Sequence, residues 1–207
     1  MSIIKELVIV GAGGHGRVIA DIAKHNGYNS IMFLDDNKAG QKVGTYTVVG
    51  DCDSMLNYNC DIIVAIGNGN IRRILQEKLL SNNKSVPTLI HPSAIIAEDC
   101  TIGCGTVVMA GAVINTGSCV GRGCIVNTCA AIDHDCNVGD YSHISVGSNL
   151  AGTVNVGGNT WVGIGAVISN NINVVDDCII GAGAAVVKDI TTSGTYIGVP
   201  AKRINKN

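Results

Sequence analysis

The stretch Gly111–Leu150, GAVINTGSCVGRGCIVNTCAAIDHDCNVGDYSHISVGSNL, decides the fold of this 207-residue chain. An aliphatic residue occupies every sixth position, and the spacing continues on both sides without a missed position. A helix repeats near 3.6 residues and a strand at 2, so a period of six fits neither as one continuous element. Each six residues must therefore be one short strand followed by one turn. The series is Ile96, Ile102, Val108, Ile114, Val120, Val126, Ile132, Val138, Ile144, Leu150, Val156, Val162, Ile168, Val174, Ile180 and Val186.

Two further positions of each hexad have a fixed character. The residue two before the aliphatic one is usually small, and the residue after it is often Gly or Asn. Stacking would bury the aliphatic and small side chains together, while Gly, Asn and Asp accept the tight or left-handed backbone of a corner. The pattern predicts a parallel β-helix in which three hexads, about 18 residues, close one triangular coil, giving about five coils. The small positions are Ala94, Cys100, Thr106, Ala112, Ser118, Cys124, Ala130, Cys136, Ser142 and Ser148.

The C-terminal end of this solenoid must be covered, because an open coil exposes unpaired backbone groups. After Val186 the period of six is lost, and the polar loop Thr191–Gly194 follows. We therefore expect Lys188–Asn207 to cap the β-helix. The second domain is predicted to span residues 91–207, because His91-Pro92 marks a boundary that a strand ladder cannot cross.

The N-terminal region is predicted to form strand, glycine turn, helix and strand. The apolar run Glu6–Val10 ends at Gly11-Ala12-Gly13-Gly14-His15-Gly16, and apolar residues then recur at helical spacing. Glycines let the backbone approach a phosphate, and the helix points its N-terminal amides at that group. A second strand, Ser30–Leu34, ends in Asp35-Asp36, where an acidic residue can accept from a ribose hydroxyl. The alternative for this acidic pair is a solvated turn.

The strand and helix alternation continues for one more unit. A third strand, Asp61–Ile66, ends in Gly67-Asn68-Gly69-Asn70, and a helix from Ile71 to about Leu80 follows with Ile74, Leu75 and Leu79 expected on its buried side. Val86–Ile90 is predicted to be a fourth strand. Such alternation indicates a parallel sheet. A dinucleotide fold needs two halves, so residues 1–90 have room for one nucleotide but hardly for NAD.

Composition excludes several classes of protein. The net charge is -2 and lysines and arginines are scattered, so no basic face for nucleic acid is expected. Hydrophobic residues make up 46% of the chain, too many for disorder, yet no apolar run approaches the ~20 residues of a membrane helix. Nine cysteines without a CxxC pair fit reduced core thiols better than disulfides. We expect a cytoplasmic protein without a membrane or nucleic-acid partner.

His134 is the candidate catalytic residue to which the residues themselves point. It lies between Asp133 and Asp135 at a corner of a solenoid with few other charges. An acidic neighbour fixes the tautomer of an imidazole and raises its basicity, as a general base needs. The alternative is a solvated corner. About 18 residues later, one coil on, the same corner holds Gly152, whose amide could meet an oxyanion. Cys136 falls on the inward small position, which favours packing over a role as nucleophile.

Three pieces of the chain together carry a resemblance to a known family. They are Gly11–Gly16 with Phe33-Leu34-Asp35-Asp36, then Ile132–Cys136, then Ile197-Gly198-Val199-Pro200-Ala201-Lys202. The chain resembles the left-handed β-helix acyltransferases with an N-terminal nucleotide-binding domain. These include the bacterial nucleotide-sugar 4-amino N-acetyltransferases of bacillosamine and perosamine type, and the sialic acid O-acetyltransferases. The resemblance implies a Rossmann-like α/β half domain followed by a left-handed parallel β-helix.

The resemblance also implies an assembly and a set of site residues. It implies a homotrimer that binds a nucleotide sugar in the N-terminal domain and coenzyme A between neighbouring solenoids, so that each active site uses two chains. The general base maps onto His134 and its acidic partner onto Asp135. Substrate contacts map onto Gly13, Gly14, His15, Asp35, Asp36 and Gly67, and coenzyme contacts onto His143, Ile164 and the backbone of Ala182.

The expected reaction is direct acetyl transfer from acetyl-CoA, without a metal or a covalent enzyme intermediate. His134 takes a proton from the sugar amine, the amine attacks the thioester, and backbone amides hold the oxyanion. The expected acceptor is a nucleotide-linked 4-amino-4,6-dideoxy sugar, because a glycine turn suits a diphosphate and Asp35 and Asp36 suit a nucleoside. The family favours UDP over dTDP or GDP, in surface polysaccharide or glycoprotein sugar biosynthesis. Sialic acid O-acetylation is the alternative, but sialic acid has no diphosphate, and its carboxylate would require cationic side chains in the binding site.

Three other classes of function explain less of the sequence. A metal site built on histidines is disfavoured because His134 and His143 are nine positions apart, half a coil, and cannot share a corner. An NAD oxidoreductase would account for Gly11–Gly16 but not for the solenoid. A non-catalytic nucleotide-sugar-binding protein would keep the hexads without needing the His134-Asp135 pair.

Overall fold

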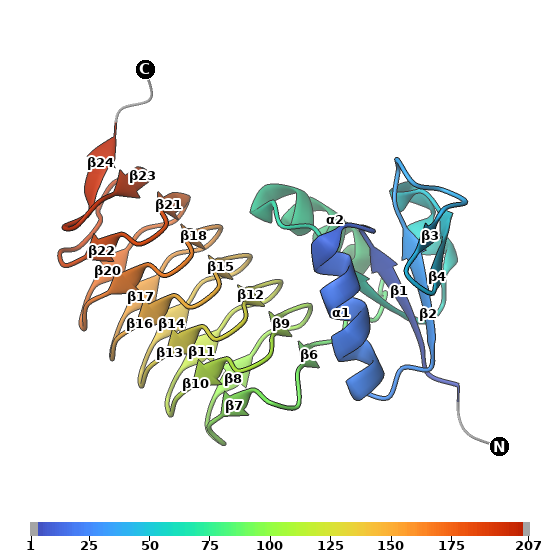
Figure 1. Cartoon of the computed structure of the whole chain (residues 1–207), viewed down its shortest axis with the longest axis horizontal. Coiled ribbons are helices and arrows are strands. Elements are labelled where there is room, and N and C mark those ends of the chain that lie inside the picture. Colours follow the sequence, from blue (N-terminus) through green and yellow to red (C-terminus); the bar gives the residue numbers. More distant parts are fainter. Residues whose placement is uncertain (1–3, 205–207) are drawn as a thin grey trace. The chain divides into compact units, whose positions relative to one another are not determined.

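The computed structural model describes residues 4–204 and divides into two compact units between Ile90 and His91 (Figure 1). The first unit is an α/β domain and the second is a solenoid of short strands. Among residues 4–204, no helix is both long and apolar enough to cross a membrane.

The N-terminal unit is a five-stranded sheet in the order β3-β4-β2-β1-β5, with helices on its faces. All neighbouring strands run parallel except β3 and β4. The unit confirms the expected strand, glycine turn, helix and strand at its start. Its elements are β1 (Glu6–Val10), α1 (Gly14–His25), β2 (Ser30–Leu34), β3 (Lys42–Val43), β4 (Tyr46–Gly50), the 3-10 helix η1 (Cys52–Asn57), β5 (Asp61–Val64) and α2 (Gly69–Ser81).

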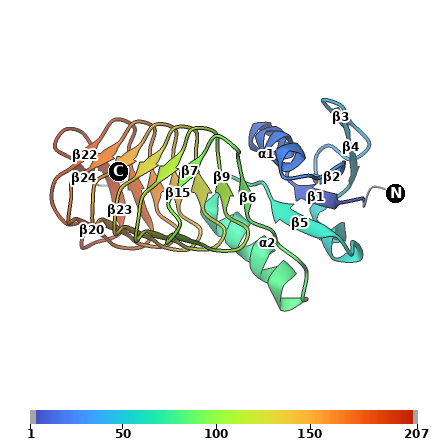
Figure 2. The same ribbon diagram turned by 90° about the horizontal axis from the view of Figure 1, so that it is seen from below.

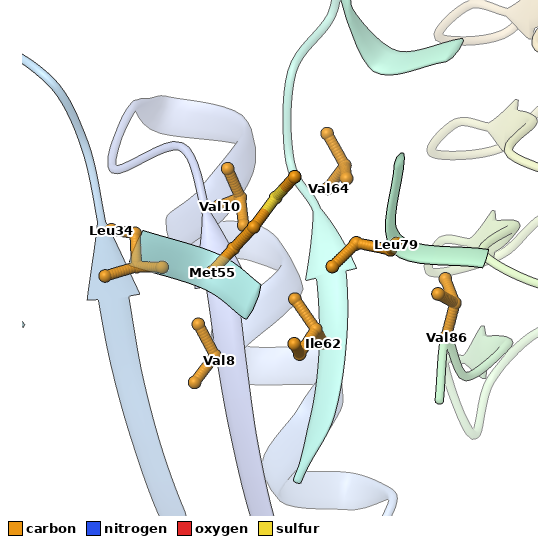
Figure 3. Close-up of a cluster of buried hydrophobic side chains, with 8 residues drawn as sticks. All are labelled: Val8, Val10, Leu34, Met55, Ile62, Val64, Leu79 and Val86. Atoms are coloured by element: carbon orange, nitrogen blue, oxygen red, sulfur yellow. The ribbon is translucent and has the colours of Figure 1, made fainter. Parts of the chain in front are cut away.

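One face of this sheet carries a compact apolar core, shown in Figure 3. Alternate residues of a strand point to the same face, so Val8 and Val10 of β1 lie beside Ile62 and Val64 of β5. Met55 of η1 packs onto them. Full burial of such side chains contributes roughly 1.5–3 kcal/mol each. The remaining members of the cluster are Leu34, Leu79 and Val86.

The second helix differs from the prediction in which face it buries. Leu79 is buried as expected and Leu75 is half-buried, but Ile74, expected on the same side, is 63% exposed. Arg72 and Gln76 are buried as well, which was not expected. The reason is that Arg72 turns inward to donate hydrogen bonds to carbonyl groups of the preceding loop. Nη1 of Arg72 donates to the carbonyls of Ile66 and Gly67 at 2.8 and 2.9 Å, which also explains why β5 ends at Val64 rather than Ile66.

Two further features of this region were not predicted or were predicted wrongly. The β3–β4 hairpin and η1 were missed. Val86–Ile90 was expected in the N-terminal sheet, but only β6 (Leu89–Ile90) is a strand and it belongs to a solenoid sheet next to β9 (Val107–Val108). Ile90 precedes Ile96 by one hexad, so it obeys the solenoid period, and the next amide, His91 N, donates to Val108 O.

The second unit is a parallel β-helix whose coils appear as successive rungs in Figures 1 and 2. Strands pair with a constant offset of one coil, as in Val113↔Ala131 and Asn137↔Asn155, which confirms three hexads per coil. Its further strands are β7 (Ile95–Ile96), β8 (Thr101–Ile102), β10 (Val113–Ile114), β11 (Cys119–Val120), β12 (Ile125–Val126), β13 (Ala131–Ile132), β14 (Asn137–Val138), β15 (His143–Ile144), β16 (Asn149–Leu150), β17 (Asn155–Val156), β18 (Trp161–Val162), β19 (Val167–Ile168), β20 (Asn173–Val174), β21 (Cys178–Ile180) and β22 (Ala185–Val186).

The interior of the solenoid follows the hexad pattern. The aliphatic residues from Val108 onward and most of their small neighbours are buried. Hydroxyls on the small positions also bridge coils, because Ser118 Oγ donates to Asp133 O at 2.7 Å and accepts from Cys136 N at 3.1 Å. The hydroxyl of Ser118 is thus satisfied by the next coil.

Between Gly105 and Gly183, each hexad turns its corner with one residue of left-handed backbone. This residue is the third after the aliphatic one, and about half of these corners use glycine there, with φ near +65° in Gly183. Asn, Asp and a few others fill the remaining corners, among them Asp135 at φ 57°. Short polar side chains tolerate this conformation better than most residues. The predicted residue types, Gly, Asn and Asp, fill most of these corners, but a Cys, a Tyr and a Thr also take the left-handed backbone, which residue type did not indicate.

The end of the solenoid is covered by a short hairpin. β23 (Gly194–Ile197) extends the sheet of β21 and pairs antiparallel with β24 (Lys202–Ile204). Arg203 Nη2 donates to Ser193 O at 2.9 Å and ties the hairpin to the polar loop. Residues 205–207 of the expected cap lie outside the described residues.

Candidate active site

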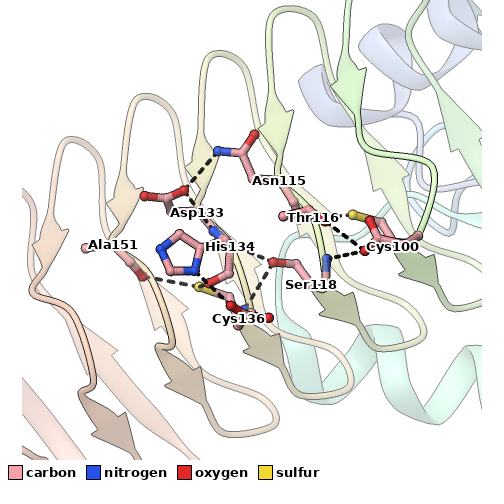
Figure 4. A network of polar contacts seen from close by, with 11 residues as sticks. Cys100, Asn115, Thr116, Ser118, Asp133, His134, Cys136 and Ala151 are labelled. Carbon is pink, nitrogen blue, oxygen red and sulfur yellow. Dashed lines mark hydrogen bonds and ion pairs between the residues drawn. The ribbon is translucent and has the colours of Figure 1, made fainter.

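The corner between β13 and β14 holds Asp133, His134 and Asp135, and Figure 4 shows the first two of them. His134 Nδ1 lies 2.8 Å from Oδ2 of Asp135. Because a carboxylate can only accept, Nδ1 carries the hydrogen and Nε2 keeps its lone pair. One coil earlier the left-handed position is Gly117, so an aspartate here supplies both the turn and the partner of the imidazole.

The electrostatics of this corner suit a base. The hydrogen bond that His134 donates to Asp135 is the main cause that raises the pKa of His134 above its ordinary value, and the nearby charge of Asp133 adds to it. Asp133 is itself anchored, since Oδ1 accepts from Asn115 Nδ2 at 2.9 Å and from His134 N at 2.8 Å. The hydrogen bond from Asn115 holds the pKa of Asp133 below its usual value.

Gly152 lies directly beside the imidazole, one coil after His134, as the sequence spacing predicts. A Cβ atom at this position would lie 2.4 Å from His134 Nε2, so only glycine leaves room for the ring. Thr153 N donates to His134 O at 2.8 Å, whereas the Gly152 amide forms no hydrogen bond within residues 4–204. The residue that lies against the imidazole thus also has an available amide hydrogen.

Cys136 belongs to the packing beneath this corner. Its side chain is buried, and Sγ donates to Ala151 O at 3.2 Å. Burial raises the pKa of the Cys136 thiol, which disfavours the thiolate that a nucleophile needs. The geometry agrees with the inward position that the hexad pattern gives it.

The expected coenzyme residues lie together on another part of the solenoid. Ile164 and Ala182 stack one coil apart at the corners after β18 and β21, where Gly183 N donates to Ile164 O at 2.8 Å. His143 is on β15, the strand next to β18 in the same sheet. His134 is on a different corner of the triangle, so one chain does not bring these residues to His134.

Two neighbours of His143 were not singled out from the sequence. Trp161 of β18 stacks on the imidazole with ring centroids 5.3 Å apart, and its Nε1 donates to Ser145 Oγ at 2.6 Å. Asn127 Nδ2 lies 3.0 Å from His143 Nε2. The signal for Trp161 was present, because it follows His143 by one coil and pairs with it in register. No comparable spacing rule points to Asn127.

In the N-terminal unit, the glycines of the first turn have two different tasks. A Cβ on Gly16 would lie 2.1 Å from Gly11 O, so this glycine allows close packing of helix α1 on the turn. Gly13 and Gly14 have open space around them, and α1 begins there without a side-chain cap. Free backbone amides at a helix start are a ready anion site.

The acidic pair after β2 is engaged with the backbone. Asp35 Oδ2 accepts from Ala12 N at 2.9 Å, which ties it to the glycine turn, and Asp36 Oδ1 accepts from Cys52 N at 2.8 Å. Lys38 Nζ donates to Ala12 O at 2.8 Å, a contact that the sequence did not suggest. Both carboxylates therefore hold loops in place, and each keeps lone pairs for further contacts.

His15 lies at the first turn of α1, and Gly67 follows β5. Nε2 of His15 is buried and forms no hydrogen bond within the part of the chain that the structure describes. Burial, helped by the charge of Arg72, lowers the pKa of His15 to about 4. A neutral imidazole with one unused ring nitrogen is thus held beside the glycine turn. Gly67 has open space where a side chain would be.

Among residues 4–204, no group of three or more His, Cys, Asp or Glu side chains is arranged to hold a metal ion. His143 lies on strand β15, whereas His134 lies in the turn after β13. The two imidazoles are therefore on different parts of the solenoid.

Comparisons with known proteins match this architecture. Residues 6–79 match the family model described as the PglD N-terminal domain. The acetyltransferase domain of PglB from Neisseria gonorrhoeae FA1090 is 40% identical, with a TM-score of 0.92 over 97% of this chain and 100% of that chain. PerB from Caulobacter crescentus, solved with CoA and GDP-perosamine, is 36% identical, with a TM-score of 0.93 over 98% and 99%. The likeness identifies the solenoid as a left-handed β-helix, as expected.

Curated relatives match over a shorter stretch. UDP-N-acetylbacillosamine N-acetyltransferase from Bacillus subtilis (strain 168) is 36% identical over 112 residues, 51% of this chain and 52% of that protein. GDP-perosamine N-acetyltransferase from Escherichia coli O157:H7 is 29% identical over 108 residues, 48% and 49%. The chain thus spans about half the length of the curated relatives it matches.

Proposed function

Because the chain belongs to the hexapeptide-repeat acetyltransferases with a PglD-type N-terminal domain, we propose that it transfers an acetyl group from acetyl-CoA to the amine of a nucleotide-linked 4-amino-4,6-dideoxy sugar. The observation that carries the proposal is the His134-Asp135 pair with Gly152 beside the imidazole. A binding protein without catalysis would need neither the pair nor the glycine.

In the proposed reaction, His134 acts as the general base. Asp135 holds the Nδ1 hydrogen, which leaves Nε2 to accept a proton from the acceptor amine as its nitrogen attacks the thioester carbonyl. The unused Gly152 amide next to Nε2 is suited to stabilise the oxyanion of the tetrahedral intermediate. When the intermediate collapses, the C–S bond breaks and the imidazolium returns its proton to the leaving thiolate.

We place the donor along the surface of His143, Ile164 and the backbone of Ala182. Because His134 is on another corner of the same coil stack, we propose that these residues serve the His134 of a neighbouring chain in a homotrimer. Sedimentation should then show a trimer. A monomer with full activity would exclude the shared site.

We place the nucleotide sugar at Gly13, Gly14, His15, Asp35, Asp36 and Gly67. Open helix amides suit a diphosphate, and the unused Nε2 of His15 offers one further polar contact. UDP is favoured because the bacillosamine enzyme matches at 36% identity and the perosamine enzyme of the curated pair at 29%. Nine free thiols fit a reducing, cytoplasmic setting, and the product would serve surface glycan or glycoprotein sugar synthesis.

The test is acetyl-CoA consumption with a panel of acceptors. UDP-, dTDP- and GDP-linked 4-amino-4,6-dideoxy sugars are compared with sialic acid and with each nucleotide alone. We expect turnover with a nucleotide amino sugar, highest with UDP. Turnover confined to sialic acid would contradict the proposal, and no turnover with any acceptor despite acetyl-CoA binding would favour a binding protein.

A further inference from the structure

The carboxylate of Asp133 is held through only one of its two oxygens. Oδ1 accepts both hydrogen bonds, from Asn115 Nδ2 and from His134 N, at 2.9 and 2.8 Å. Oδ2 forms no hydrogen bond within residues 4–204. Since these donors hold the pKa of Asp133 below its usual value, the side chain carries a full negative charge at neutral pH. One oxygen is thus oriented but unused, on the residue next to the general base.

This carboxylate borders a hollow on the outer face of the solenoid. The hollow has a volume of about 480 Å³ and extends over β13, β16 and β19, with Asn149, Ala151 and Val167 in its lining. Asp133 is the one charged residue among the described residues that line it. Figure 4 shows Asp133 and His134 on the same corner, between Asn115 of the preceding coil and Ala151 of the next. A group in this hollow meets the carboxylate of Asp133, and His134, which does not line the hollow, is the next residue of the chain.

Asp135 cannot provide the same contact, although it is equally close in sequence. Its Oδ2 is 2.8 Å from His134 Nδ1, on the side of the ring opposite to Nε2. It therefore serves the orientation of the base. The two aspartates that flank His134 have separate tasks in this geometry, one facing the ring and the other facing the hollow.

We propose that Asp133 binds the amino group of the acceptor in its ammonium form and so makes the site select an amine over a hydroxyl. The inference rests on the proposed acetyl transfer. Aliphatic amines have pKa values of about 8 to 10, so the acceptor arrives protonated at neutral pH. A carboxylate attracts this cation and gives a sugar hydroxyl no comparable gain.

The proton balance of the step is complete with the groups named. The bound ammonium first loses one proton to solvent through the open hollow, which leaves a neutral amine hydrogen-bonded to Asp133. The amine nitrogen forms the C–N bond to the acetyl carbon, and His134 Nε2 takes a second proton. The C–S bond then breaks and this proton passes to the thiolate. The products are the acetamido sugar, CoA thiol and one proton in solvent.

The experiment uses Asp133→Asn, whose amide oxygen can still accept from Asn115 and from His134 N. Two quantities are measured for the full chain: kcat/KM for the UDP-linked 4-amino sugar, and Ki of the matching UDP-linked 4-hydroxy sugar as a competitive inhibitor. We expect kcat/KM for the amine to fall about 10- to 100-fold, the usual effect of losing one charge-assisted contact, while Ki stays within about twofold. Asp133→Glu, which keeps the charge, should retain more activity than Asp133→Asn.

The matched control is Asp176→Asn, another corner aspartate whose Oδ1 accepts a backbone amide of the preceding coil, Gly158 N, at 2.7 Å. It should leave both quantities unchanged. An equal loss of amine turnover and inhibitor binding in Asp133→Asn would mean that Asp133 only shapes the site, and would overturn the inference. Unchanged turnover would also overturn it. Wild-type protein that binds the hydroxy sugar but never acetylates the amine would overturn the proposed function together with this inference.

Discussion

The solenoid corner and the glycine turn of the N-terminal unit build their sites by different means. At the corner, a constant register of one coil stacks side chains, so His134 meets Gly152 and His143 meets Trp161. In the N-terminal unit the proposed site relies mainly on backbone amides, and nearby side chains also stabilise their own loops, as Asp35 does for Ala12. Side-chain substitutions should therefore affect chemistry at the corner and binding at the turn.

The largest expected effect is that of His134→Ala. Loss of a general base typically costs 10²- to 10⁴-fold in rate, and we expect kcat to fall by about this amount. Acetyl-CoA affinity should change little, because the proposed coenzyme contacts are made by His143, Ile164 and the backbone of Ala182 rather than by His134. Both are measurable on one sample, since the chain has a single tryptophan, Trp161, which stacks on His143 and whose fluorescence should change when the coenzyme binds at the proposed surface. Near-normal kcat would rule out the assigned base.

Gly152→Ala tests whether space at the corner is required. The added Cβ would lie 2.4 Å from His134 Nε2 and must displace the ring. A displacement of about 1 Å can cost roughly 10²-fold, so we expect kcat to fall by about one to two orders of magnitude. The control is Asn170→Ala, one coil further along the same corner, which should be neutral. Equal kcat for Gly152→Ala and wild type would show that the ring need not lie where it does.

Asp35→Ala tests the other side of the comparison. Removing this carboxylate frees Ala12 N and loosens the glycine turn. KM for the nucleotide sugar should therefore rise about tenfold while kcat is retained, because the lost contact binds the substrate and the transition state equally. Asp36→Ala should have a smaller effect, because Asp36 holds Cys52 rather than the turn. Steady-state kinetics separate the two. A fall in kcat without a change in KM would contradict the division between binding and chemistry.

The solenoid was predictable from sequence because its period fixes neighbours. The hexads placed the buried ladder, the left-handed corners and Gly152 beside His134, and the same arithmetic would have placed Trp161 against His143 and Ile90 in the solenoid. The N-terminal unit was predictable as strands and helices, but not in detail. A buried arginine breaks the apolar pattern of α2, since Arg72 satisfies two carbonyls of a loop that no periodicity describes.

The smallest expected effect is a shift in the pH dependence of kcat/KM, and it tests the role of Asp135 at the corner most directly. The base must be neutral to act, so kcat/KM should rise with pH through the pKa of His134, which lies above 6.5 mainly because of the hydrogen bond with Asp135. Asp135→Asn removes the charged acceptor, so the pKa should fall and the acid limb of the profile should move to lower pH. The rate at the plateau should fall by less than in His134→Ala. Asp140→Asn is the control, because Asp140 is a corner aspartate that pairs with Arg122 instead, and it should leave the profile unchanged. In Asp135→Asn, the acid limb could instead stay in place or move to higher pH. Either result would show that Asp135 does not set the basicity of the imidazole, and would contradict its role as the partner of His134.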